Sequence, residues 1–298
     1  LGPCEIVQAS GGIGRKDDVW KFSVGGVIAP AKADKGIRLE ILVEVNKTPA
    51  GIIILGSAEV DVANGTQIGK ATLEINIPEK RVSGSIVFAM DYKAITANAQ
   101  LDLCVKFGEY WYVYGRARID VLKFFTNDGI IVVANNWQWQ HDGQTRLMSG
   151  IYIEVNSNFK VDANWYVVRW GVNFDRHAMV YIGWNGDFAG EIDMNGGAYA
   201  CIGFGSFDLI QARASMGLAA HISYIDPEFT AGASGHFRLK GSIGWCGNAG
   251  CWSICWKCFI RIFGHCIFAL PTGATACIGM NADIQYATGR GMTWSVSF

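Results

Sequence analysis

The chain alternates apolar and polar residues over long stretches. Residues 37–45, for example, place Ile, Leu or Val at every odd position and mostly charged residues between them. A period of two sends successive side chains to opposite faces of a β-strand. No segment has a 3.6-residue period with helix caps, so little or no helix is expected. The same alternation recurs at 71–77, 82–92, 95–107, 109–123, 151–162, 188–195, 210–224, 229–245, 274–286 and 292–298.

These stretches predict an all-β fold in which long antiparallel strands follow one another in a meander. Tight connections such as residues 78–81, Pro-Glu-Lys-Arg, join neighbouring stretches. Several stretches exceed ten residues, whereas strands usually have about five or six. Such strands are expected to be rolled into an extended sandwich, tube or barrel. From Ala212 to Ile222 the apolar positions include several alanines, and small residues let a second layer approach closely. That favours two packed sheets over a wide water-filled pore.

The composition changes near residues 127–150, where a polar stretch rich in Asn and Gln interrupts the aliphatic pattern. Gly, Trp and Tyr are more frequent after it. We therefore expect an N-terminal β-meander at 1–135 and a Gly/aromatic-rich β region at 136–298, which contains a cysteine cluster at 246–266. One continuous domain is the alternative. The first residue is Leu rather than Met, which fits a removed leader or a segment of a longer protein.

Charge argues against nucleic acid as a partner. Charged residues make up 17% of the chain and the formal net charge is −1. A protein that binds nucleic acid needs a basic surface to neutralise phosphates, and this sequence has none.

The cysteines indicate cross-links. The chain has 9 cysteines, and an odd number leaves at least one thiol free or bonded to another chain. A structural zinc site usually takes two Cys-x2-Cys pairs, whereas this cluster has one pair and irregular spacings. Disulfides in an oxidising compartment are favoured over a metal site, with unpaired core thiols as the third alternative. The clustered residues are Cys246, Cys251, Cys255, Cys258 and Cys266.

Candidate chemistry is sparse. Trp137 and Trp139 could stack on a sugar ring, with neighbouring amides binding its hydroxyls. Their placement on a long hairpin, with the indoles lying on the sheet, is the favoured interpretation. The sequence has no nucleophile elbow, no paired metal-binding histidines and no phosphate loop. We therefore expect no catalytic residue, metal or cofactor, and no enzyme.

The chain has predicted strands in which Gly and aromatic residues are frequent. Examples are residues 109–117, Glu-Tyr-Trp-Tyr-Val-Tyr-Gly-Arg-Ala, and the later Gly/aromatic stretches. In this respect it resembles the large, β-rich secreted surface proteins of Bacteroidota. The resemblance implies export and an extracellular or cell-surface location. The first functional hypothesis is a non-catalytic structural or adhesive component, such as part of a filament, whose partners are other subunits or copies of itself.

The second hypothesis is an outer-membrane β-barrel that acts as a pore or transporter. In the last stretch the apolar residues Met292, Trp294, Val296 and Phe298 alternate with Thr and Ser, as in the terminal strand of such barrels. Stretches of ten or more residues also suit a tilted membrane span. The cysteines and the lack of long loops weigh against it. A carbohydrate-binding β protein, with a glycan as partner, is the third hypothesis, beside an amphipathic β-groove that carries lipid.

Overall fold

The computed structural model describes residues 4–30, 37–62, 67–92, 94–122, 124–141, 143–204, 207–225, 227–244, 254–262 and 265–298. Within these ranges the chain forms seventeen strands and no helix, so no helix in them could span a membrane. The strands are β1 (Cys4–Lys16), β2 (Val19–Pro30), β3 (Ile37–Thr48), β4 (Gly51–Val62), β5 (Gln67–Asn76), β6 (Arg81–Tyr92), β7 (Ile95–Lys106), β8 (Tyr110–Val121), β9 (Phe125–His141), β10 (Gln144–Trp165), β11 (Val168–Gly183), β12 (Phe188–Phe204), β13 (Phe207–Ile225), β14 (Glu228–Gly244), β15 (Ile254–Ile262), β16 (His265–Ala287) and β17 (Gly291–Ser297).

The chain divides into two compact units. Unit 1 comprises Leu1–Leu122, Asn127–Glu154 and Tyr181–Gly186, and unit 2 comprises Lys123–Thr126, Val155–Val180 and Asp187–Phe298. Strands β1–β8 therefore lie in unit 1 and β12–β17 in unit 2, while β9, β10 and β11 contribute to both. The boundary that the composition predicts, at 135/136, lies within β9.

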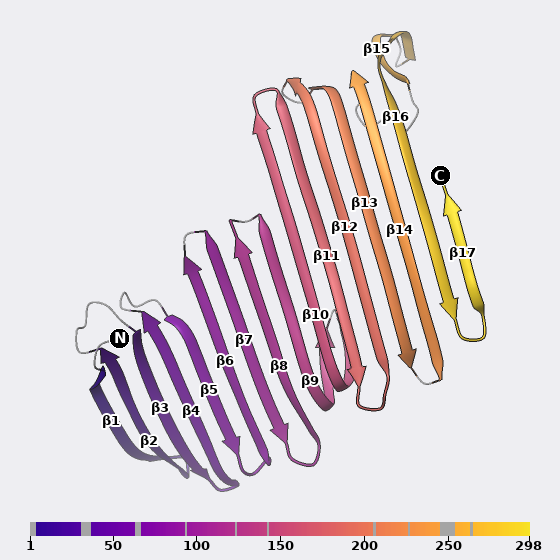
Figure 1. Cartoon of the computed structure of the whole chain (residues 1–298). Helices are drawn as coiled ribbons and strands as arrows, with labels where there is room; N and C mark the ends of the chain where they lie inside the picture. The colour runs from indigo at the N-terminus through magenta and orange to yellow at the C-terminus, as the bar shows by residue number, and fades with distance from the viewer. Residues whose placement is uncertain are drawn as a thin grey trace. The chain divides into compact units, whose positions relative to one another are not determined.

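Strands β1 to β8 form an antiparallel meander in which each strand pairs with the next (Figure 1). Short turns set the registers. Asp17 and Asp18 join β1 to β2 with φ angles of 49° and 60°, the left-handed conformation that a two-residue hairpin turn requires. The predicted all-β antiparallel meander is thus confirmed.

The registers sort the side chains of unit 1 onto one apolar face and one polar face, because residues directly opposite each other point the same way. On the polar face, ion pairs bridge neighbouring strands: Lys21 with Glu44 at 2.7 Å, for example. One row across the apolar face runs from β2 to β8 through Val24, Val43, Gly56, Leu73, Gly84, Leu103 and Val113.

Unit 2 is built in the same way. Asn195, Gly217 and His236 are directly opposite on its polar face. An apolar row crosses β12, β13, β14 and β16 through Gly196, Met216, Phe237 and Met280. No second sheet covers this row among the described residues, since Met216 is 63% exposed and Phe237 42%. The expectation of two packed sheets is therefore wrong here.

Few apolar side chains of the described residues are buried. Described residues in the middle of the apolar faces, such as Leu73 and Ile86, are 44% and 53% exposed. In neither unit does a described pairing return the last strand to the first, so the sheet is open rather than closed into the expected sandwich, tube or barrel. Within each unit, no described element covers the apolar face.

Candidate functional site

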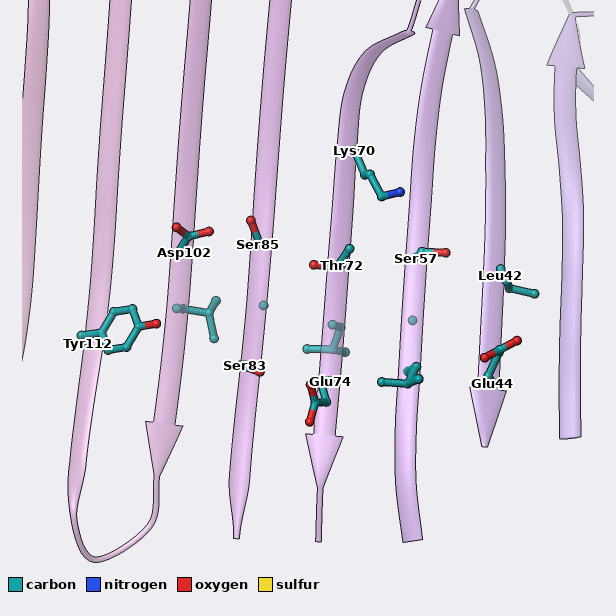
Figure 2. Close-up of a pocket in the computed structure, with 15 residues that line it drawn as sticks. Leu42, Glu44, Ser57, Lys70, Thr72, Glu74, Ser83, Ser85, Asp102 and Tyr112 are labelled. Carbon is teal, nitrogen blue, oxygen red and sulfur yellow. The ribbon is translucent and has the colours of Figure 1, made fainter. Parts of the chain in front are cut away.

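A hollow of about 480 Å³ lies on the polar face of unit 1. It crosses the middle of strands β3 to β8, and most of its lining comes from side chains of that face. Figure 2 shows these side chains on adjacent antiparallel strands that run side by side. The residues labelled there are Leu42, Glu44, Ser57, Lys70, Thr72, Glu74, Ser83, Ser85, Asp102 and Tyr112.

Register and side-chain size create this hollow. Thr72 of β5 is directly opposite Ser57 of β4 and Ser85 of β6, and Ser85 is opposite Asp102 of β7. Because Ser and Thr are small, the row stands low above the backbone. Ser83, in the next row, adds a fourth hydroxyl. The result is a shallow depression with a floor rich in hydroxyl groups.

These hydroxyls are accessible to a ligand. The side chains of Ser57, Ser83 and Ser85 are half-buried and that of Thr72 is exposed. Within the described part of the chain none of the four forms a side-chain hydrogen bond with the protein. Each hydroxyl can both donate and accept a hydrogen bond, so the floor offers hydrogen-bonding capacity that only solvent or a ligand can use.

Three of the four charged side chains that line the hollow, Glu44, Lys70 and Glu74, are held in ion pairs, and the fourth, Asp102, accepts a hydrogen bond from Gln100. Arg81 donates a hydrogen bond to Glu74 at 2.7 Å, and this contact lowers the pKa of the Glu74 carboxyl despite some desolvation. Lys70 lies 2.6 Å from Glu59, and Glu44 pairs with Lys21. The hollow is therefore polar without a concentration of one charge.

An aromatic cluster begins at the end of the hollow that β8 forms. Tyr112 stacks on Trp137 with ring centroids 4.0 Å apart, and Trp137 lies 6.2 Å from Trp139. Trp139 meets the edge of Tyr152 at 4.9 Å, and the Tyr152 hydroxyl donates to buried Glu154. Burial raises the pKa of the Tyr112 phenol above its ordinary value of 10.0.

The structure thus brings the two sequence-predicted sugar-stacking residues together in one cluster. Trp139 is only 5% exposed, whereas Trp137 is half-buried with one ring face against Tyr112. Sugar stacking by these two residues stays a prediction. The hollow beside them was not predicted, because its residues come from six strands.

The cysteine cluster lies largely outside the described residues. Cys246 and Cys251 lie outside the described residues. Cys255, Cys258 and Cys266 lie within described strands, but their side chains are not described. Their predicted disulfide bonding or metal binding stays a prediction. Cys104 and Cys201 are described, and both are buried free thiols. No group of three or more metal-ligating side chains occurs among the residues that the structure covers.

Unit 2 also has hollows. One is lined by Ser215, His236 and Asn281, and a smaller one by Glu191 and His221. These described hollows are lined mainly by residues of the polar faces, and the larger one of unit 2 also by Phe237, Ile278 and Met280 of the apolar face.

No protein-family model matches the chain, and neither a curated protein nor a solved structure matches it.

Proposed function

We propose that this protein is a membrane-inserted, amphipathic β-sheet protein of the pore or transporter type. In this proposal the apolar faces contact lipid hydrocarbon, and the polar faces line a water-filled passage. The open edges of the sheet pair with further copies of the chain, because unpaired backbone groups are too costly in hydrocarbon. An outer membrane is the setting that such sheets imply. The observation that carries the proposal is the continuous apolar face of each unit, which no described element of that unit covers.

The ends of the strands support a lipid environment. On the apolar face of unit 2, Phe188 stacks on Tyr224 at 6.0 Å, and Phe229 lies 5.9 Å from Tyr286. All four residues stand beside the short turns that join β13 to β14 and β16 to β17, or at the start of β12. Trp294 of β17 follows on the same face, opposite Ile284. Aromatic side chains gather in this way at the boundary between hydrocarbon and water.

Unit 1 has a similar boundary at the ends of β1, β2 and β3. Trp20 is directly opposite Arg15 on one side and Lys47 on the other. The Arg15 guanidinium lies 5.5 Å from the centroid of the Trp20 ring. Long basic side chains near the end of an apolar band can extend their charges to the water.

Strand length in unit 1 fits the same environment. Strands β2, β3, β4, β6, β7 and β8 each have 12 residues. A strand of this length tilted by about 45° spans about 28 Å, close to the thickness of a bilayer's hydrocarbon core.

The position of the hollows favours a water-filled passage over a lipid-carrying groove. A groove for lipid would be hollowed on its apolar side, whereas the hollows described here are lined mainly by residues of the polar faces. A structural assembly, the first hypothesis from the sequence, would cover the apolar faces with other protein copies. It offers no reason for aromatic residues to gather at the strand ends.

The test compares two adjacent positions of β5 that face opposite ways. A fluorescent non-natural amino acid is placed at position 73, on the apolar face, or at position 72, on the polar face. Each chain is reconstituted into phosphatidylcholine vesicles whose acyl chains carry bromine, a short-range quencher. We expect strong quenching at position 73 and little at position 72. Unquenched fluorescence at both positions, with lipid-free filaments or regular particles, would overturn the proposal in favour of a protein assembly.

A further inference from the structure

The hollow of unit 1 has the chemistry of a binding site for an uncharged solute. Its volume of about 480 Å³ lies in the usual range of small-molecule sites. Lys70 pairs with Glu59 and Glu74 with Arg81, so these charges are already satisfied within the sheet. A ligand that paired with Lys70 or Glu74 would have to displace an ion-pair partner, whereas a neutral ligand can hydrogen-bond to the hydroxyls and to the Asp102 carboxylate without doing so.

The spacing of the hydroxyls suits a ligand with several polar groups. Ser57, Thr72 and Ser85 are directly opposite one another on three adjacent strands. Neighbouring strands are about 4.8 Å apart, so the row presents hydroxyls at regular short intervals. Asp102 continues the row on β7 as an acceptor, and it also accepts a hydrogen bond from Gln100. A ligand lying across the strands could use several of these groups at once.

Tyr112 adds an aromatic group and a hydroxyl where the hollow ends on β8. Its ring is held against Trp137 by stacking at 4.0 Å. Held in this way, the side chain loses little freedom when a ligand binds, and its phenol can donate a hydrogen bond while the aromatic edge contacts C–H groups. A molecule that carries both C–H groups and hydroxyls matches this combination.

We propose that the hollow on the polar face of unit 1 binds an uncharged polyhydroxylated solute of the simple-sugar class. The role of such binding, selection of a solute within the passage, rests on the proposed function, whereas the binding chemistry does not. Thr72 and Ser85 are the central hydrogen-bonding residues of this site.

The experiment measures glucose binding to the full chain in detergent micelles by equilibrium dialysis and by saturation-transfer NMR. Thr72→Val removes one hydroxyl with little change of shape, and Ser85→Ala removes another. Each substitution should weaken glucose binding about 5- to 10-fold, the usual effect of losing one hydrogen bond. Thr96→Val is the matched control, because Thr96 lies on the same polar face, opposite Asp120, and does not line the hollow.

Unchanged glucose binding in Thr72→Val and Ser85→Ala, or an equal loss in Thr96→Val, would overturn the proposal. Binding of inorganic phosphate in place of glucose would overturn it too, since that would identify a site for charged ligands. The outcome is separable from that of the bromine-quenching test. Glucose binding with the expected variant pattern, in a chain whose position 73 is not quenched, would leave this site standing while the membrane proposal falls.

Discussion

Leu73→Arg offers a sharp test of what covers the apolar face. Leu73 lies in the middle of that face, directly opposite Gly56 on β4 and Gly84 on β6, and it is 44% exposed. The chain itself covers only about half of the Leu73 side chain. In water, losing these contacts in Leu73→Arg would therefore lower the free energy of unfolding by on the order of 1 kcal/mol. An arginine facing hydrocarbon at mid-depth costs about 2–4 kcal/mol. The larger cost therefore appears only when lipid contacts the face.

The control is Thr72→Arg, at the adjacent residue on the polar face. Its cost should stay within about 0.5 kcal/mol, as for most surface substitutions. The assay is guanidinium unfolding of vesicle-reconstituted protein, followed by tryptophan fluorescence. A difference of about 2–4 kcal/mol corresponds to roughly a 30- to 900-fold change in the ratio of folded to unfolded protein. Equal costs for the two variants would refute the reasoning, because the apolar face would then be as well hydrated as the polar one.

Three further predictions concern the polar face and the packing. Because Arg81 lowers the pKa of Glu74 below its ordinary value of 4.5, their contact should stabilise the fold above that pH and be lost as the pH falls through the folded-state pKa. Urea titrations from pH 7 to pH 3 should show this loss in the natural chain and not in Glu74→Gln. A Cβ at Gly150 would overlap the backbone of a neighbouring strand, so Gly150→Ala should lower the free energy of unfolding by about 1–3 kcal/mol. Gly241→Ala, which meets nothing within 4 Å, should change it little in the same measurement. Burial raises the pKa of the Cys104 thiol, so iodoacetamide at pH 8 should modify it only after denaturant is added. Modification of Cys104 in the native protein, detected by peptide mass mapping, would contradict this prediction.

The alternation of residues predicted eleven of the seventeen described strands and missed β1, β2, β4, β9, β11 and β15. In 37–45 and 71–77 every second residue is apolar, and the registers place these residues together on one side of unit 1. Alternation does not say what covers a face or whether edge strands meet, because both depend on contacts between residues far apart in the chain. The expected rolling into a sandwich, tube or barrel went beyond what a period of two can specify.

The row of Thr72, Ser85 and Asp102 in the hollow could have been predicted from the lengths of the turns. The tight turn at residues 77–80 pairs Ile75 with Val82, which already sets Thr72 opposite Ser85. The short connection after β6 then sets Ser85 opposite Asp102. The aromatic cluster gave no comparable signal. Tyr112 and Trp137 are distant in sequence, and Asn136 has a φ of 55°, an irregularity that simple alternation does not reveal.

The nearest-neighbour pairing of β1 to β8 has a consequence for how such a chain could arise and change. Each strand depends for its backbone partners on the strands immediately before and after it. Contacts of this kind are local in sequence and can form one hairpin at a time. A hairpin could therefore be duplicated, lost or exchanged without disturbing the registers of the others. Two-strand modules added in series are a simple evolutionary route to sheets of different widths.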